Sequence, residues 1–152
     1  MTETNSVEYV LGFAFEAVRS RHTGEPEAPY IVYLIEKNKP EWQKGHLNGI
    51  GGKVEKDETP HQAMVREFRE EAGLHVASVR WKYRGDMYFP NGAKVHLFTS
   101  LLREDERPFT AEVEIVRPIR LVDLKSMKTI PNLKWIIPML LDDDLEGLHV
   151  CR

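Results

Sequence analysis

The chain has 152 residues, of which 41% are apolar and 30% charged, and its formal net charge at pH 7 is −3. This length suits a single domain with a substantial core, and the composition is that of an ordinary soluble globular protein. The negative net charge argues against a nucleic-acid polymer or an anionic membrane as the partner.

The cysteine content and the lack of long apolar runs indicate a cytoplasmic protein. Cys151 is the single cysteine and cannot form an internal disulfide, which fits a reducing compartment. The N-terminus has no basic-then-apolar signal segment. No apolar run approaches the roughly 20 residues that a membrane helix needs.

The first third of the chain predicts two strands joined by a loop. β-branched and aromatic residues dominate both strands, whereas glycine and proline mark the loop between them. The predicted segments are a disordered start (1–6), a strand (7–18), a loop (21–29), a buried strand (30–36) and a polar loop (37–48), after which a glycine-rich turn follows.

A helix is predicted at about residues 60–72. Thr59 can cap its N-terminus, Pro60 suits the first helical position, and Gln62 lies three residues after Thr59, as a capping box requires. Gly73 follows the last turn, where a left-handed residue often ends a helix.

The second half of the chain predicts more strands and a second helix. The dipeptide Asn91-Gly92 between apolar runs indicates a hairpin turn. The expected segments are a strand (76–87) with a polar bend at 84–86, a hairpin (88–102), a charged loop (103–110), an edge or bulged strand (115–121) containing Pro118, and an apolar helix (132–141) that Pro138 should kink or break. Strands around one central helix, with another helix near the end, predict an α/β fold with helices on the faces of a sheet.

Glu67, Glu70 and Glu71 share one face of the predicted helix, because residues three and four apart are neighbours on a helix surface. An adjoining apolar stripe can pack on the sheet; it consists of Met64, Phe68 and Ala72. Clustered carboxylates repel one another, and a bound Mg²⁺ would remove that penalty. The alternative is a solvated acidic face with Arg66 and Arg69 as surface partners.

The spacing of these residues favours the metal-binding interpretation. Gly52 is followed by five residues and Glu58, and seven residues later comes Arg66-Glu67-Phe68-Arg69-Glu70-Glu71-Ala72-Gly73-Leu74. The stretch 52–74 matches the Nudix box, G-x5-E-x7-R-E-U-x-E-E-x-G-U with U bulky and apolar, at every fixed position. The chain therefore resembles the Nudix hydrolases of the MutT type.

The resemblance implies one Nudix domain over residues 1–152, with an α/β/α sandwich and a mixed β-sheet between the helices. It also implies Mg²⁺-dependent hydrolysis of a nucleoside diphosphate linked to another group, with Mn²⁺ able to replace Mg²⁺. The substrate would be a small nucleotide, and a homodimer is compatible with these expectations.

The resemblance also assigns metal ligands and catalytic residues. Glu70 and Glu71 would ligate the metal directly, Glu67 would be a ligand or the general base, and the Gly51 carbonyl would be a backbone ligand. The family often adds a glutamate from a later loop before an Arg-Pro pair, and Glu112 has the favoured spacing. Two alternatives remain for this loop. Glu114 could be the ligand instead, or Glu112 and Glu114 could both lie on a solvated strand edge without binding metal.

Other residues of the box are expected to be structural. Glu58 and Arg66 would pair and hold the loop against the helix. Gly52 would let the turn bend tightly, and Gly73 would end the helix. Lys53 could reach a phosphate or remain a solvated lysine.

The residues around the start of the Nudix box indicate which nucleotide is the substrate. Residues 47–55 resemble enzymes that hydrolyse oxidised purine nucleoside triphosphates, in which an asparagine at the position of Asn48 helps to bind the base. Ile130 and Asn132 stand where those relatives have tryptophan and aspartate, which argues against specificity for oxidised guanine. Trp42 is expected to border the nucleotide pocket, and Trp135 either stacks on a base or belongs to the core.

The favoured activity is therefore a (d)NTP pyrophosphohydrolase that releases a nucleoside monophosphate and pyrophosphate. Two alternatives remain. Pro90 lies near the distance past the box at which enzymes acting on ADP-ribose or other nucleotide sugars carry a proline. A non-catalytic nucleotide sensor is the other, although sensors generally lose box glutamates and all three are present here.

Overall fold

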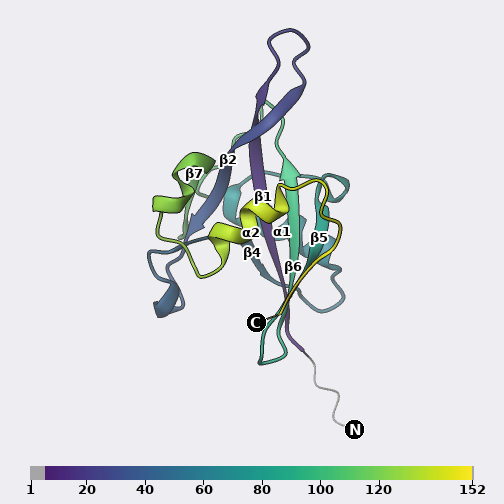
Figure 1. The fold of residues 1–152 in the computed structure, drawn as a ribbon. Helices are drawn as coiled ribbons and strands as arrows, with labels where there is room; N and C mark the ends of the chain where they lie inside the picture. Colours follow the sequence, from purple (N-terminus) through teal and green to yellow (C-terminus); the bar gives the residue numbers. More distant parts are fainter. Residues whose placement is uncertain (1–5, 152) are drawn as a thin grey trace.

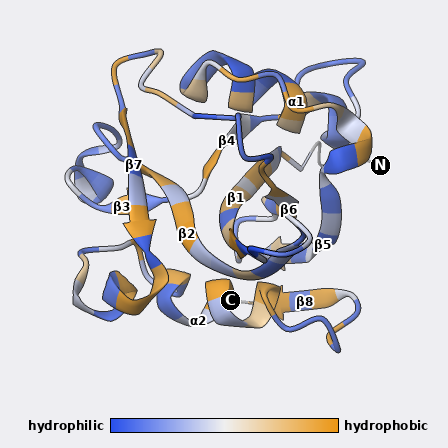
Figure 2. Ribbon diagram, turned by 90° about the horizontal axis from the view of Figure 1, so that it is seen from above, coloured by the Kyte–Doolittle hydropathy of each residue, from blue (hydrophilic) through white to orange (hydrophobic). Residues whose placement is uncertain are grey.

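An eight-stranded mixed β-sheet forms the centre of the molecule, and one α-helix covers each of its faces (Figure 1, Figure 2). The computed structural model describes residues 6–151, so the predicted disorder of residues 1–6 falls almost wholly outside the described residues. The strands are β1 (Glu8–Arg19), β2 (Pro26–Glu36), β3 (Leu47–Asn48), β4 (Ile50–Lys53), β5 (Lys82–Tyr88), β6 (Lys94–Leu101), β7 (Ile115–Arg120) and β8 (Leu148–Cys151). The α-helices are α1 (Pro60–Ala72) and α2 (Leu133–Leu140), and short 3-10 turns span Glu41–Gln43, Ser78–Arg80 and Leu121–Ser126. The predicted α/β/α sandwich with a mixed sheet is confirmed.

Strand β1 lies at the centre of the hydrogen-bonded network. The order of the main sheet is β3-β2-β1-β6-β5-β8, while β4 pairs with β1 and β7 pairs with β2. β1 runs parallel to β6, and β5 runs parallel to β8; the other pairs are antiparallel. Three strands therefore bond to β1, which ties the glycines of β4 to the middle of the sheet.

The sheet separates two hydrophobic cores, because alternate side chains of β1 point to opposite faces. Val10 and Ala14 pack with α1, whereas Leu11, Phe13 and Phe15 pack with α2. The helices complete the cores with these buried residues: Ala63, Met64, Phe68 and Ala72 from α1, and Leu133, Ile136, Ile137 and Leu140 from α2. Figure 2 shows the two helices on opposite sides of the sheet.

The ends of α1 form as the sequence predicts. The Gln62 backbone N–H donates to Thr59 Oγ1 over 3.2 Å, and the Thr59 backbone N–H donates to Gln62 Oε1 over 2.9 Å. This is a complete capping box. Gly73 ends the helix with φ of 67°, a left-handed conformation that favours glycine, and its N–H donates to the Arg69 carbonyl.

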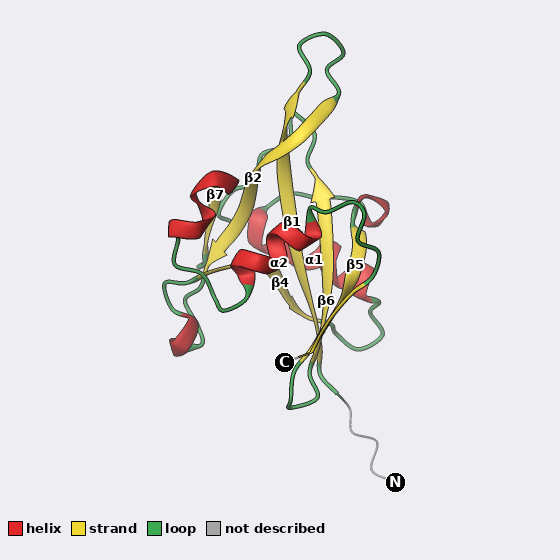
Figure 3. Ribbon diagram, in the orientation of Figure 1, coloured by secondary structure: helices red, strands yellow, loops and turns green. Residues whose placement is uncertain are grey.

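Two predictions before α1 are wrong. Gly51 and Gly52 do not form a turn but lie in β4, opposite Leu11 and Val10 of β1. The segment 21–29 is a loop only up to residue 25, because β2 already begins at Pro26. The β1–β2 pair extends beyond the rest of the sheet as a projecting arm (Figure 3). Its register shifts twice, and such irregularities accommodate prolines in a strand.

The later elements follow the predictions in part. The hairpin with its loop at Asn91-Gly92 is confirmed. Among the described strands β7 pairs only with β2, so the strand containing Pro118 lies at an edge. The strand predicted at 76–87 is wrong in its first half, since a 3-10 turn precedes β5. The predicted bend at 84–86 coincides with a register shift between Tyr83 and Gly85.

Of the remaining elements, α2 was predicted from the sequence, whereas β3 and β8 were not. α2 runs through Pro138 and ends two residues later at Leu140. β3 and β8 were not predicted, because two to four residues carry too little periodicity. Within residues 6–151, the structure contains no helix that is long and apolar enough to cross a membrane.

Replacing the cap of α1 should destabilise the fold. Thr59→Ala removes the acceptor for the Gln62 N–H and should lower the free energy of unfolding by about 1 kcal/mol. Urea denaturation measures this change. Thr59→Ser is the matched control, because a serine hydroxyl can make the same bond; equal stability of both variants would contradict the importance of the cap.

Candidate active site on helix α1

The three predicted glutamates of α1 lie at the junction of the helix with β4. The Glu67 side chain is 13% exposed and that of Glu70 is 46% exposed. Glu71 is half-buried. Phe68 and Ala72, on the adjoining face, are fully buried in the core. Packing of this apolar stripe fixes the rotation of α1, so the carboxylates run from the solvent into the junction.

Arg66 links these carboxylates to the preceding loop. Its Nε and Nη2 donate to the two carboxylate oxygens of Glu58 over 2.7 and 2.9 Å, which is the predicted structural pair. Its Nη1 donates to Glu67 Oε1 over 2.8 Å and to Glu70 Oε2 over 3.2 Å. Nη2 also donates to the Lys53 carbonyl over 3.0 Å. One guanidinium therefore neutralises part of the charge of three glutamates and joins α1 to β4.

Both glycines of β4 lie in close approaches. A Cβ at Gly52 would lie 2.4 Å from Glu67 Oε1, so a larger residue there would displace that carboxylate. A Cβ at Gly51 would lie 1.9 Å from the Val10 carbonyl oxygen of β1. The Gly51–Gly52 pair thus lets the sheet and the carboxylates approach each other directly.

Burial makes the carboxylates of Glu67 and Glu71 harder to ionise. It raises the pKa of Glu71 to about 8, helped by the negative charge of Glu67 and opposed by the positive charge of Lys37. Burial likewise raises the pKa of Glu67, although Arg66 acts in the opposite direction. Glu71 Oε2 is buried and has no hydrogen-bond partner among the described residues.

The chemistry of these residues suits a hard divalent cation. The unpartnered Glu71 oxygen and the neighbouring carboxylates are oxygen donors, which Mg²⁺ prefers, and water and substrate phosphates usually complete its coordination. Within residues 6–151, no three acidic, histidine or cysteine side chains converge closely enough to hold an ion by themselves. Oxygens of Glu67 and Glu70 accept hydrogen bonds from the Arg66 guanidinium in this structure.

The loop before β7 brings two further glutamates toward Glu71. The Ala111 N–H donates to the Glu71 carbonyl over 3.1 Å, which attaches this loop to the end of α1. Glu114 Oε1 accepts from Lys37 Nζ over 3.1 Å, and Glu114 Oε2 accepts from the Asn38 N–H over 2.6 Å. Glu112 is exposed. The charges of both glutamates contribute to raising the pKa of Glu71, so both candidates lie within electrostatic reach of the cluster.

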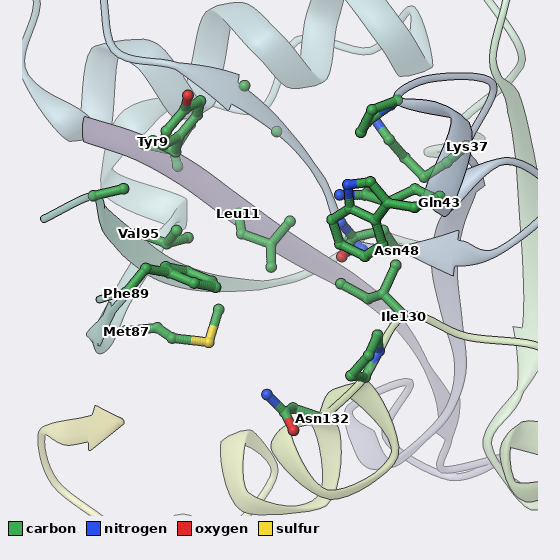
Figure 4. Close-up of a pocket in the computed structure, with 18 of the residues that line it drawn as sticks. Tyr9, Leu11, Lys37, Gln43, Asn48, Met87, Phe89, Val95, Ile130 and Asn132 are labelled. Atoms are coloured by element: carbon green, nitrogen blue, oxygen red, sulfur yellow. The ribbon is translucent and has the colours of Figure 1, made fainter. Parts of the chain in front are cut away.

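A cavity of about 530 Å³ opens beside the glycines of β4 (Figure 4). Of the predicted substrate-binding residues, Trp42, Asn48 and Asn132 line it, but Lys53 does not. Lys53 is exposed, and its contact with the site is through its carbonyl. The lining residues are Tyr9, Val10, Leu11, Lys37, Pro40, Trp42, Gln43, Asn48, Gly49, Gly51, Gly52, Met87, Phe89, Asn91, Ala93, Val95, Ile130, Pro131 and Asn132.

The two predicted asparagines present their amides differently. Asn48 Oδ1 accepts a hydrogen bond from the Gly49 N–H over 2.8 Å, which leaves the amide NH₂ as its free donor toward the cavity. Asn132 has φ of 78° and precedes α2 without capping it through its side chain. Asparagine is one of the few non-glycine residues that adopt this left-handed conformation readily.

The two candidate tryptophans have different positions. Trp42 lines the cavity at its rim with 60% of its surface exposed. Trp135 is 42% exposed and does not line this cavity. Neither the stacking role nor the core role proposed for Trp135 matches its position.

One apolar side of the cavity and two residues opposite to it were not predicted from the sequence. Met87, Phe89 and Val95 of the β5–β6 hairpin face Lys37 and Gln43 across the cavity (Figure 4). The alternation of Met87 and Phe89 along a strand could have indicated a shared face. No comparable pattern marks Lys37 or Gln43, which belong to a polar segment without periodicity.

Comparison with known proteins identifies the family of this chain. The family model described as the NUDIX domain matches residues 14–141. The chain belongs to the Nudix family. It is a Nudix hydrolase, and enzymes of this family act on nucleoside diphosphate derivatives and typically use a divalent metal.

Solved structures show the same fold at low sequence identity. A Nudix hydrolase from Nitrosomonas europaea is 18% identical, with 97% of this chain and 79% of that chain covered and a TM-score of 0.71. A MutT protein from Bacillus halodurans is 19% identical, with 94% and 86% covered and a TM-score of 0.68. The C-terminal domain of mouse MUTYH, in complex with human PCNA, is 14% identical, with 95% and 94% covered and a TM-score of 0.66. No curated protein sequence matches this Nudix hydrolase.

The raised pKa of Glu71 predicts how the stability of the metal-free protein depends on pH. Between the ordinary value of about 4.5 and the folded value of about 8, the unfolded chain releases a proton that the folded chain retains. Stability should therefore fall as the pH rises through this window, and Glu71→Gln should remove that contribution. Melting temperatures in the presence of a chelator at pH 5 and pH 8.5 measure the effect.

Glu70→Gln is the matched control, because it removes a carboxylate from the same helix at an exposed position. Relative to wild type, Glu71→Gln should gain more stability at pH 8.5 than at pH 5, and this difference should exceed that of the control. An equal gain at both pH values would contradict the assignment.

Proposed function

We propose that this Nudix hydrolase is a nucleoside triphosphate pyrophosphohydrolase, which releases a nucleoside monophosphate and pyrophosphate. The observation that carries the proposal is the continuity of the cavity with the carboxylate cluster. The cavity has the size of small-molecule sites in proteins and reaches Gly51 and Gly52, and Glu67 packs against Gly52. One nucleotide can therefore place its base in the cavity and its phosphates beside α1.

The inner part of the cavity suits a nucleobase. Asn48 and Asn132 supply amide groups, which can donate to and accept from a base edge. Met87, Phe89 and Val95 supply an apolar surface for the faces of a planar ring. A polar edge and apolar faces are the two properties that a nucleobase presents.

The carboxylate end suits the phosphates. Glu67, Glu70, Glu71, the Gly51 carbonyl and Glu112 would hold Mg²⁺, or Mn²⁺ in its place. When bound, such an ion neutralises phosphate charge, polarises phosphoryl oxygens and lowers the pKa of a coordinated water. Lys37 lines the cavity and its positive charge acts on Glu71, so it stands between the base end and the phosphate end.

A carboxylate of the chain would act as the general base of the reaction. A water oxygen bonds to phosphorus, the bridging P–O bond to the leaving pyrophosphate breaks, and a carboxylate takes the proton of the water. Glu67 or the loop glutamate is the candidate acceptor.

The two alternative functions have less support. Pro90, which suggested an ADP-ribose or nucleotide-sugar pyrophosphatase, is exposed and does not line the cavity. A non-catalytic sensor would not need the buried carboxylates, yet Glu67, Glu70 and Glu71 are all present at the junction with β4.

A hydrolysis screen tests the proposal. The purified protein with Mg²⁺ is given canonical and oxidised (d)NTPs, ADP-ribose, dinucleoside polyphosphates and NADH, and the products are separated by chromatography. Triphosphates should yield monophosphate and pyrophosphate, and Glu71→Gln should lose most turnover. Preference for ADP-ribose would overturn the proposal, and nucleotide binding without any product would favour the sensor.

The loop glutamates allow a paired prediction. If Glu112 is the metal ligand or base, Glu112→Gln should lower kcat more than it raises KM, because the lost interaction belongs to the transition state. Steady-state kinetics of Glu112→Gln and Glu114→Gln separate the two candidates. A large loss of kcat in Glu114→Gln alone would transfer the role to Glu114.

Asn48→Ala should weaken base recognition without abolishing the reaction. Loss of a buried hydrogen-bonding group costs about 1–3 kcal/mol, which corresponds to roughly a 5- to 150-fold rise in KM for the preferred triphosphate. Discrimination between bases should also decrease. Asn38→Ala is the control, since Asn38 does not line the cavity. An unchanged base preference in Asn48→Ala would show that Asn48 only supports the Gly49 backbone.

A further inference from the structure

Lys37 and Glu114 are brought together by the register of two strands. Glu36 pairs with Ile115 at the end of the β2–β7 ladder, so Lys37 and Glu114 are the next residues of the two segments. Lys37 Nζ donates to Glu114 Oε1 over 3.1 Å, and the Asn38 N–H donates to Glu114 Oε2 over 2.6 Å. The Lys37 and Glu114 side chains are 20% and 16% exposed, so water still reaches the ion pair.

The backbone of Lys37 is fixed, whereas its ammonium can reach more than one partner. The Lys37 N–H donates to the His46 carbonyl over 2.9 Å, and the Lys37 carbonyl accepts from the Gly45 N–H over 2.8 Å. The side chain lines the cavity that also reaches the glycines of β4 (Figure 4). Because lysine carries its charge on a flexible stem, the ammonium can turn between Glu114 and a ligand in the cavity while the backbone stays in place.

The charge of Lys37 also acts on the carboxylate cluster. Burial and the charge of Glu67 raise the pKa of Glu71, Lys37 opposes this rise, and the charge of Glu114 adds to it. Lys37 therefore neutralises part of the negative charge around Glu71 and Glu114. A divalent cation at the cluster would do the same, and the two positive charges would repel each other.

Lys37 is held less firmly than Arg66, which also contacts the cluster. Arg66 forms hydrogen bonds to three glutamates at once. Among the described residues, the Lys37 ammonium forms an ion pair with Glu114 alone. An ion pair that water can reach contributes little to stability, because water solvates the separated charges. Breaking this single contact therefore costs less than freeing the Arg66 guanidinium.

We propose that Lys37 is an exchangeable counter-ion of the carboxylate cluster. A divalent cation bound at the cluster takes over the neutralisation of Glu71 and Glu114, and the Lys37 ammonium then turns into the cavity and pairs with a phosphate of the nucleotide. Metal and nucleotide strengthen each other's binding in this way, because both favour the same position of one side chain. This inference rests on the proposed metal and nucleotide site, but not on which nucleotide is the substrate.

Mn²⁺ binding to the nucleotide-free protein, measured by calorimetry, tests the exchange. Lys37→Met removes the competing charge and should bind Mn²⁺ more tightly than wild type, by roughly 5-fold or more, the lower end of coupling between sites. The same substitution in Glu114→Gln should gain much less, because Lys37 then lacks the partner that holds it at the cluster. Lys44→Met is the matched control, since Lys44 lies on the same loop, exposed and outside the cavity, and should bind Mn²⁺ like wild type.

Nucleotide binding tests the second step. The four ribonucleoside 5′-monophosphates are titrated into the protein in a chelator and in Mn²⁺. Lys37→Met should lose affinity relative to wild type in Mn²⁺ but not in the chelator, because without metal Lys37 stays paired with Glu114. The same loss under both conditions would mean that Lys37 always contacts phosphate, and no loss under either would mean that it never does; both results overturn the exchange.

The outcomes also separate this inference from the proposed function. An Mn²⁺ affinity of Lys37→Met equal to that of wild type, or the same gain with and without Glu114, overturns the exchange even if triphosphates are hydrolysed. Tighter Mn²⁺ binding in Lys37→Met that depends on Glu114 sustains it whichever nucleotide the hydrolysis screen favours.

Discussion

The candidate site depends on keeping several carboxylates close together, and Arg66 is the residue that makes this arrangement stable. Its guanidinium bonds to Glu58, Glu67, Glu70 and the Lys53 carbonyl. A planar guanidinium suits this role because its donors form a rigid fork that can bind carboxylates from several sides. Without it, like charges on adjacent turns of α1 would repel, and β4 would lose a direct link to the helix.

The rest of the architecture follows from this junction. β4 pairs with β1, and β1 also contributes Leu11 to the cavity wall, so one strand connects the carboxylate cluster with the cavity. The absence of a Cβ at Gly52 allows the Glu67 carboxylate to lie against this strand. The positions of the carboxylate cluster and of the cavity are thus set by the same sheet.

The sequence predicts the parts of this protein that local rules determine. The capping box of α1, its left-handed end and the hairpin at Asn91-Gly92 each involve residues close in sequence, and all three are present. The Gly51–Gly52 pair was misread as a turn, because glycine near a bend and glycine beneath a carboxylate look alike in sequence. Lys37 and Gln43 were missed as cavity-lining residues, since residues of a polar loop have no distinguishing pattern in the sequence.

The sides of the cavity come from residues 40–48 and from residues 87–95, whereas the carboxylate cluster comes from α1 and the loop before β7. Loops and hairpin ends tolerate substitution better than packed helices do. Mutation in either of the first two segments can therefore change the shape and polarity of the cavity while the carboxylate cluster stays as it is. In a protein arranged in this way, the cavity and the cluster can evolve separately.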